Sequence, residues 1–377
     1  MSTAATAKTQ FIAYNDELAE EIWSTKTHFE VRDNNTLTKL GLMAEAKGDE
    51  DGFERQPGTA IQVHSEFGKQ AGQDMTIRLI RKLKRGLRLD ENGATTLITY
   101  TRGTSYPVGY EELPRGMYNK IWLSLIKHQI AQDSPDLLGQ RTTLNLEGTW
   151  KRLLTDWLTD AEEEQCIDAH IDGQAYPAIA DSLASTIANQ NLYYVSGAAT
   201  DETVDTTMKM SSRELRRIMR MCEAKHLQPI KIEGEEAFVV MMSSALISDL
   251  LNEDEFQRVV SQAHDRGSKN PLISGSIGHF YNLYIVSYPR VRLVSNTNVE
   301  QVMILGAGAL LMGYGSMPKW FTRNEDGYGS RYGLQIGRIM GVARSQFYDT
   351  TTNGGATYLN QASGTWKCYR ANEPWEA

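Results

Sequence analysis

The chain has 377 residues, a formal net charge of −8, 41% hydrophobic residues and 23% charged residues. These proportions are ordinary for a globular protein, and the length allows about two or three domains. The negative charge excludes a protein that coats nucleic acid with its whole surface, so any contact with DNA must be local. The first ten residues lack the apolar core of a signal peptide, and the longest apolar run, near Val302–Met312, is well short of the roughly 20 residues that span a bilayer. We therefore expect a soluble protein made in the cytoplasm.

The three cysteines, Cys166, Cys222 and Cys368, are scattered along the sequence. Their number is odd and their spacing is not that of metal ligands, so neither a disulfide framework nor a zinc site is indicated. We expect buried or incidental thiols in a reducing environment.

The first part of the chain contains few helical signals. Residues before Phe11 are expected to be disordered, and Phe11–Trp23 suits a short helix or an arm lying on a neighbour. Residues 47–58 have the polar, glycine-containing composition of a loop.

Residues 61–110 are predicted to form long strands. Met75–Leu79 alternates apolar and polar residues, Ala94–Tyr100 is rich in strand formers, and Asn92-Gly93 is a turn signal between them. A hairpin of this length with so few large apolar residues has little core of its own. We therefore expect it to lie on other protein.

Two helices are predicted in the middle of the chain. The first covers about 139–171, between Pro135 and Gly173. The second covers Ser211–Lys225, with Ser211 as the N-cap and Glu214 as its capping-box partner. In the first helix the apolar stripe is Trp150, Leu153, Leu154, Trp157, Leu158 and Ala161, while Lys151, Arg152, Asp156 and Asp160 are expected to face away.

The second half of the chain is predicted to be rich in strands. A buried strand is expected at Ala237–Met242, followed by short helices over 244–251 and 253–263. Beyond Gly275 glycines punctuate the sequence, which fits tight turns and close backbone approach. Further strands are expected at 280–287, 291–295, 299–305 and 336–342, and the turn at Thr351–Gly355 predicts a last hairpin.

Gly306-Ala307-Gly308 follows an apolar strand and is similar to the opening of a dinucleotide-binding loop. However, Leu311 occupies the third glycine position, and Pro318 leaves room only for a short helix afterwards. Close packing of two elements through small residues is the better interpretation.

Acidic and histidine residues cluster twice near the end of the first predicted helix. Asp168, His170 and Asp172 alternate, and on a helix they point in different directions, which disfavours a metal site. His170 is interpreted as a cation-capable residue near a helix C-terminus. The pair Glu111-Glu112 and the run Glu162–Glu164 supply carboxylates of the kind used in acid–base catalysis, but a solvated helix face explains Glu162–Glu164 far better.

The sequence contains neither a Gly-x-Ser-x-Gly elbow nor a phosphate-binding Gly-x-x-x-x-Gly-Lys-Ser/Thr loop. We therefore predict no catalytic, cofactor-binding or metal site. One basic cluster lacks interleaved aromatic residues for base stacking, and we favour a contact with an acidic surface of an adjacent copy over a contact with DNA. The cluster consists of Arg78, Arg81, Lys82, Lys84, Arg85 and Arg88.

A series of loose motifs, in order along most of the chain, resembles the major capsid proteins of tailed bacteriophages, specifically the N4-like podovirus capsid family. The order of the motifs carries the resemblance more than any single one. They are Trp23-Ser24, Gly109–Glu112, the Trp150 and Trp157 stripe, Asn270-Pro271-Leu272 with Gly275, the small-residue block Leu305–Gly313, Asp326–Gly329, and Gly341-Val342 before Phe347.

The resemblance implies an α+β protein with the capsid fold first described in the phage Hong Kong 97. It implies an N-terminal arm over 1–58, an extended hairpin loop over 59–113 and a peripheral domain over 114–205 that contains a long spine helix at about 139–171. An axial domain over 206–344 and C-terminal strands over 345–377, which return to the peripheral domain, complete the expected order.

The function implied by the resemblance is self-assembly into an icosahedral shell around a double-stranded DNA genome, in the virion. The implied partners are further copies in hexamers and pentamers, scaffolding, portal and decoration proteins, and packaged DNA on the inner surface, with no membrane and no cofactor. Two alternatives remain open at this point: an NAD-dependent oxidoreductase that uses the Gly306 loop, and a nucleic-acid-binding protein that uses the Arg78–Arg88 cluster.

Overall fold

The computed structural model gives the arrangement of helices and strands from Ser24 to Arg370. It describes residues 24–45, 59–65, 74–80, 116–133, 146–172, 192–225, 227–232, 235–257, 278–291, 293–294, 298–323, 331–345, 347–352, 355–359 and 362–370. Several predicted features lie outside the described residues: the arm 11–23, most of the loop 47–58, the turn and strand over 92–100, Glu111-Glu112, the helix portions 139–145 and 258–263, and the motifs 270–275 and 326–329.

The first sheet has six strands among the described residues and is dominated by the 14-residue strand β14 (Arg331–Arg344). Along one side, β14 pairs antiparallel with β12 (Leu310–Tyr314) and β13 (Lys319–Arg323), and along the other it pairs with β5 (Ser124–Asp133). Beyond β12 lie the parallel strands β2 (Ile61–His64) and β1 (Met43–Glu45). The sequence analysis places Ile61–His64 in the extended loop, whereas all four residues are buried in this sheet.

The second sheet has seven strands among the described residues, and its central strand is β8 (Glu235–Met242). Alternate residues of β8 belong to two different hydrophobic cores. Phe238, Val240 and Met242 contact the helices on one face, while Val239 and Met241 join the core shared with the first sheet. The remaining strands are β6 (Leu192–Tyr194), β7 (Ile230–Ile232), β9 (Gly278–Phe280), β10 (Leu283–Ser287), β11 (Val299–Leu305) and β17 (Ser363–Tyr369).

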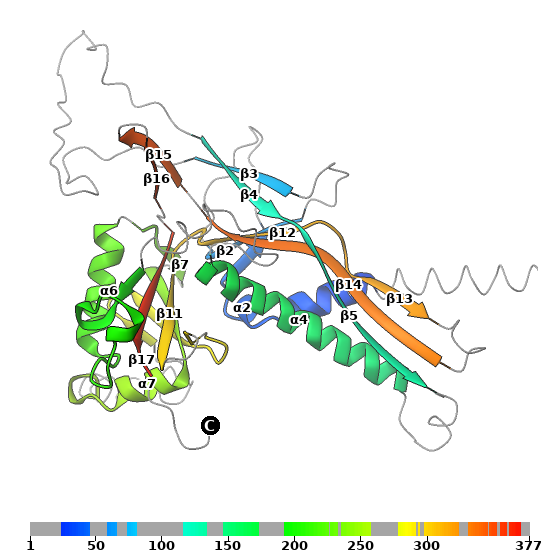
Figure 1. Ribbon diagram of the computed structural model, residues 1–377, viewed down its shortest axis with the longest axis horizontal. Coiled ribbons are helices and arrows are strands. Elements are labelled where there is room, and N and C mark those ends of the chain that lie inside the picture. The colour runs from blue at the N-terminus through cyan, green and yellow to red at the C-terminus, as the bar shows by residue number, and fades with distance from the viewer. Residues whose placement is uncertain are drawn as a thin grey trace, which may run out of the picture.

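Two short helices cover the second sheet, and both begin at a serine cap (Figure 1). In α6 (Ser212–Ala224) the Glu214 amide donates to Ser211 Oγ over 3.4 Å, which confirms Ser211 as the N-cap. The Glu214 carboxylate accepts from Arg217 over 2.9 Å and does not complete the predicted capping box. In α7 (Ser244–Leu251) the Leu246 amide donates to Ser243 Oγ over 3.5 Å. A capped first turn satisfies backbone donors that would otherwise lack partners.

The long helix α4 (Leu146–Asp172) runs along the ribbon of β14 and β5 (Figure 1). Its predicted end is confirmed within one residue. Trp150, Leu154 and Leu158 are buried, but Leu153 is 53% exposed, so the apolar stripe is narrower than expected. A helix over residues 24–34, here called the N-terminal helix, and the short α2 (Thr36–Lys39) lie on the same side of the first sheet as α4.

Two small two-stranded sheets lie above the body in the view of Figure 1. β3 (Asp74–Ile80) confirms the predicted strand at Met75–Leu79, and it pairs with β4 (Gly116–Trp122). Met75 and Ile77 are 6% and 4% exposed and join the main core, so the base of the predicted loop rests on its own chain. The predicted last hairpin is confirmed by β15 (Phe347–Thr352) and β16 (Gly355–Leu359).

Gly306–Gly308 connects β11 of the second sheet to β12 of the first. A Cβ on Gly306 would lie 2.4 Å from the Gln228 carbonyl oxygen, and Gly308 has a φ of +68°. Strand β12 follows directly, where a dinucleotide-binding loop would open a helix. The interpretation as close packing is therefore confirmed on geometry, and the cofactor loop is not supported.

Candidate functional site

The first candidate site is a buried charge network centred on Arg338 of β14, whose side chain is 1% exposed. Arg338 Nη1 lies 2.5 Å from Glu162 Oε1 of α4, and its Nη2 donates to His28 Nδ1 of the N-terminal helix over 2.9 Å. The guanidinium also lies 3.4 Å from the ring centroid of Tyr314, whose hydroxyl donates to Glu162 Oε2 over 3.0 Å. Four separate elements therefore meet at one buried ion pair.

Burial sets the protonation of this network. Desolvation, followed by the positive charge of Arg338, lowers the pKa of His28 to about 4, so the ring is neutral near pH 7. Burial also raises the pKa of Glu162, although Arg338 opposes that shift. Because His28 Nδ1 accepts the bond from Arg338, the proton of the neutral ring is on Nε2.

The neighbouring Glu163 fixes the start of α2 to α4. Its Oε1 accepts from the Thr36 amide over 2.5 Å, and its Oε2 accepts from the Tyr288 hydroxyl over 3.0 Å. Glu162 and Glu163 are 1% and 3% exposed. The prediction that Glu162–Glu164 form a solvated face is therefore wrong for two of the three residues, because their partners come from distant parts of the chain.

The end of α4 is held by a second buried polar group. Arg344 donates to Ser363 Oγ over 2.7 Å and to the His170 carbonyl over 3.3 Å, while His170 Nε2 lies 3.1 Å from the Gly364 carbonyl oxygen. Burial lowers the pKa of His170 to about 3 and that of Arg344 to about 9. His170 is therefore neutral, and its interpretation as a cation at the helix end is wrong.

The second candidate site is the outward face of the three-stranded ribbon β13–β14–β5, on the side away from α4. Leu125 on β5, Phe321 on β13 and Ile339 on β14 are 59%, 51% and 39% exposed. Register places Ile339 directly opposite Leu125, and Phe321 belongs to the same face because outward residues alternate. β5 and β13 each have one side without a strand partner among the described residues. An apolar face with unpaired edges is typical of a contact surface.

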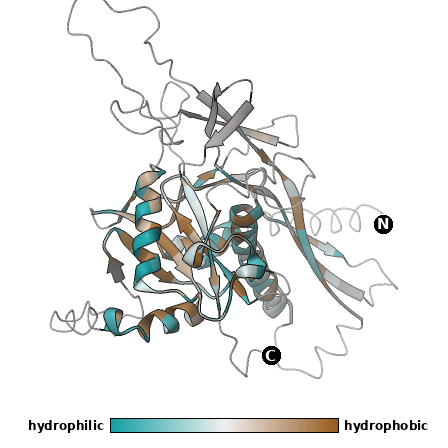
Figure 2. Cartoon of the chain, turned by 60° about the vertical axis from the view of Figure 1, so that its left-hand side comes forward, coloured by the Kyte–Doolittle hydropathy of each residue, from teal (hydrophilic) through white to brown (hydrophobic). Residues whose placement is uncertain are grey.

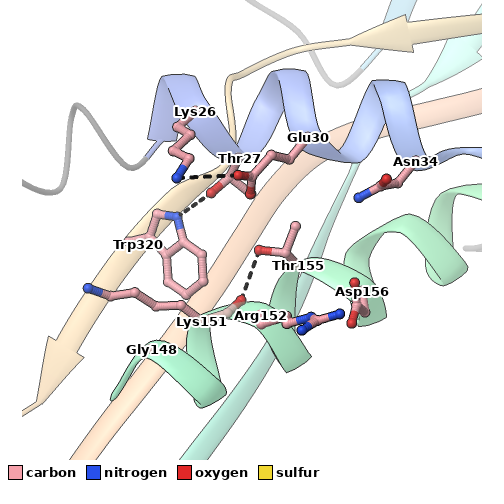
Figure 3. Close-up of a pocket in the computed structure, with 10 residues that line it drawn as sticks. All are labelled: Lys26, Thr27, Glu30, Asn34, Gly148, Lys151, Arg152, Thr155, Asp156 and Trp320. Atoms are coloured by element: carbon pink, nitrogen blue, oxygen red, sulfur yellow. Dashed lines mark hydrogen bonds and ion pairs between the residues drawn. The ribbon is translucent and has the colours of Figure 1, made fainter. Parts of the chain in front are cut away.

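A groove of about 660 Å³ lies between the N-terminal helix and α4 (Figure 3). Trp320 forms part of its lining and donates from Nε1 to Thr27 Oγ1 over 3.0 Å. Lys26 lies 3.5 Å from Glu30, and Thr155 donates to the Lys151 carbonyl over 2.8 Å. Each of these two contacts joins residues of the same helix, and they do not converge on one point of the groove. The groove is therefore the junction between two packed helices.

The predicted contact residues are largely outside the described part of the chain. Arg78 lies in β3 opposite Tyr118, and the other five, Arg81, Lys82, Lys84, Arg85 and Arg88, fall among residues that the structure does not describe. Their role remains a prediction. Two other expectations concern described residues. Cys166, Cys222 and Cys368 are buried free thiols, as expected. Within the described residues, His, Cys, Asp and Glu form no cluster suited to a metal ion.

Comparison with known proteins decides the family. A family model described as "phage capsid protein" matches residues 119–367, which is more than half of the chain. The chain belongs to the phage capsid protein family. The matched region includes the ribbon, α4 and nearly all of the second sheet. No curated protein matches the sequence.

Solved phage capsids have the same fold as this capsid protein. The capsid of Ralstonia phage GP4 is 18% identical, with 84% of this chain and 88% of that chain covered and a TM-score of 0.61. The cyanophage Pam1 capsid is 16% identical, covers 86% and 92%, and has a TM-score of 0.64. The acidic stable capsid of Helicobacter pylori bacteriophage KHP30 is 11% identical, covers 88% and 91%, and has a TM-score of 0.60. The expected α+β capsid fold of the Hong Kong 97 type is confirmed, while the N4-like subtype remains a prediction.

None of the described helices combines the length and the apolar composition needed to cross a membrane.

Proposed function

We propose that this capsid protein is the major shell subunit of a tailed bacteriophage, and that its copies assemble as hexamers and pentamers into an icosahedral container for double-stranded DNA. Its role in this proposal is structural and not catalytic, and it is exercised in the virion after synthesis in the host cytoplasm. Scaffolding, portal and decoration proteins are the further partners.

The observation that carries the proposal is the match of the phage capsid family model over residues 119–367. The outward face of the ribbon adds physical support, because Leu125, Phe321 and Ile339 leave apolar area exposed on a single chain. Obligate interfaces bury on the order of 2,000 Å² or more, and closed symmetry limits growth to a finite shell.

We assign the parts of the fold to the expected domains as follows. We assign the first sheet with α4 as the spine helix to the peripheral domain, and the second sheet with α6 and α7 to the axial domain. This assignment differs from the expected bounds, because β12–β14, expected in the axial domain, belong to the first sheet, and β17, expected to return to the peripheral domain, belongs to the second sheet. We assign the base of the extended loop to the paired strands β3, which contains Arg78 of the basic cluster, and β4, which begins at Gly116, beyond the expected end of the loop at residue 113. A contact between that cluster and an acidic surface of a neighbouring copy remains part of the proposal.

Expression of the full chain and negative-stain microscopy test the function directly. We expect megadalton particles of uniform diameter, alone or with a scaffolding protein. A stable monomer under every assembly condition would contradict the proposal. Saturable binding of a nicotinamide dinucleotide would favour the oxidoreductase, and tight salt-sensitive DNA binding by the monomer would favour the nucleic-acid-binding alternative.

A further inference from the structure

Helix α6 carries a stripe of four arginines on the face opposite its buried residues, here called the arginine stripe: Arg213, Arg216, Arg217 and Arg220. The spacing of three, one and three residues gathers them within about a third of the helix circumference. The buried face consists of Ser212, Glu214, Leu215, Ile218, Met221 and Cys222. In Figure 1 α6 lies at the outer edge of the second sheet, and hydrophilic colour runs along it in Figure 2.

Two of these arginines are already paired within the chain. Arg216 lies 3.0 Å from Glu255, and Arg217 lies 2.9 Å from Glu214. Among the described residues, Arg213 and Arg220 form no ion pair, and both are exposed. The stripe therefore presents two uncompensated positive charges on a chain whose net charge is −8.

The pattern of charge around the stripe favours a protein partner over DNA. Glu255, which pairs with Arg216 of the stripe, is 55% exposed, and the adjacent Glu253 and Asp254 are acidic as well. A phosphate backbone would be repelled by these carboxylates, whereas mixed arginine and carboxylate surfaces match a mixed protein surface. Arginine is also the basic side chain that pairs best with carboxylates in an interface.

A complementary acidic surface lies on the part of the chain that is built on the second sheet, as α6 is. The loop that packs along β17, through the 2.8 Å ion pair of Lys367 with Asp201, exposes Glu202 and Asp205. Asp205 accepts from the Thr207 amide over 2.9 Å and from its hydroxyl over 2.6 Å, which lowers the pKa of the carboxyl and keeps it ionised. Neither Glu202 nor Asp205 pairs with the arginine stripe within the described residues.

We propose that the arginine stripe of one copy docks on the Glu202–Asp205 loop of the next copy, so that the axial lobes join in a ring. The contact rests on the proposed shell function and specifies one of its interfaces. It joins two different surfaces, and a repeated contact of this kind closes into a ring when its rotation allows. Complementary charge sets the register of neighbouring copies more than it adds affinity.

Charge reversal and a charge swap test the contact. The full chain is prepared as the parent, as R213E/R220E, as E202K/D205K, and as the swapped chain that carries all four changes. Shell yield is measured by sedimentation and negative stain, and folding by circular dichroism. We expect each double variant to lose at least about tenfold in shell yield, because like charges then face one another, and the swapped chain to regain most of it.

The control K39E/K231E makes the same change of net charge at exposed lysines outside the stripe, and we expect it to assemble like the parent. If folded R213E/R220E assembles normally, or if the swapped chain assembles no better than the double variants, the contact is wrong. Normal assembly of R213E/R220E together with weakened binding to duplex DNA would assign the stripe to the genome instead. Absence of shells from the parent would count against the proposed function itself, and so the two failures are distinguishable.

Discussion

Arg338 and Glu162 form an ion pair in which both side chains are 1% exposed, and the two residues are 176 positions apart in the sequence. Moving two charges out of water costs free energy, so the intact ion pair adds little net stability to the fold. Removing one partner is strongly destabilising, because it leaves the other charge buried without a counter-charge. Since His28 and Tyr314 complete the same network, the pair determines how the N-terminal helix lies on α4 and the first sheet.

Replacement of one partner should be strongly destabilising. E162Q removes the carboxylate and leaves Arg338 buried without its counter-charge, so we expect a loss of about 3–5 kcal/mol in the free energy of unfolding. The measurement is denaturant unfolding of the unassembled protein. E45Q at the exposed Arg32–Glu45 pair is the control, and we expect a change of about 1 kcal/mol or less there. Equal losses of unfolding free energy in E162Q and E45Q would contradict the conclusion that the Arg338–Glu162 pair is buried.

The stability of the N-terminal helix should fall as the pH falls from about 6.5 to about 4. His28 has a folded pKa of about 4 against an ordinary 6.5, so the unfolded state binds its proton first. Stability from the neutral ring is complete above the ordinary pKa, is lost across this window, and changes no further below the folded pKa. Protonation also places a positive charge against Arg338 and Arg32, with Glu45 opposing them.

Hydrogen exchange of residues 24–34 across this pH range is the measurement. H28Q keeps an acceptor for Arg338 without a group that titrates, and we expect its exchange to depend much less on pH. His170 has a pKa lowered to about 3 and acts in the same direction, but it lies at the end of α4. A pH response confined to residues 168–172 would assign the effect to His170 and contradict the role of His28.

Local signals in the sequence account for the elements that could be predicted. Serine caps mark α6 and α7, and apolar runs mark β8 and β11. The sequence analysis expects Ala94–Tyr100 to follow Met75–Leu79 in a hairpin, whereas the described partner of β3 is Gly116–Trp122, which comes from across the intervening loop sequence and carries no local signal of this pairing.

The buried glutamates illustrate a signal that the sequence did contain. Glu162 lies four residues after Leu158 and four before Cys166, both of which are buried, so it falls in line with the apolar stripe of α4. Its partners, in contrast, come from β12 and β14 and leave no local trace. The arginine stripe of α6 was also visible as spacing, but only the structure shows which face of that helix is buried.

Gly306 should tolerate no side chain. In G306A the new Cβ would lie 2.4 Å from the Gln228 carbonyl oxygen and 2.9 Å from that of Ala362, and both are backbone atoms that cannot rotate away. We expect a loss of about 3 kcal/mol or more, measured by denaturant unfolding. G337A is the matched control, because its Cβ would meet its nearest neighbours at 3.5 Å or more, and we expect a change within about 1 kcal/mol. Equal stability of the two variants would show that the segments before β7 and β17 do not lie as close to Gly306 as described.

The outward face of the ribbon should be needed for assembly but not for folding. Leu125 is 59% exposed and lies opposite Ile339, so L125D places a charge on the apolar face without disturbing the buried side of β5. We expect the free energy of unfolding of L125D to stay within about 0.5 kcal/mol of that of the parent, as for exposed positions in general. We also expect sedimentation to show a loss of shells. L125M keeps an apolar side chain of similar volume and should assemble normally. Shells of normal yield from L125D would mean that this face remains open to solvent in the assembled particle, and the apolar contact would then have to be sought elsewhere on the chain.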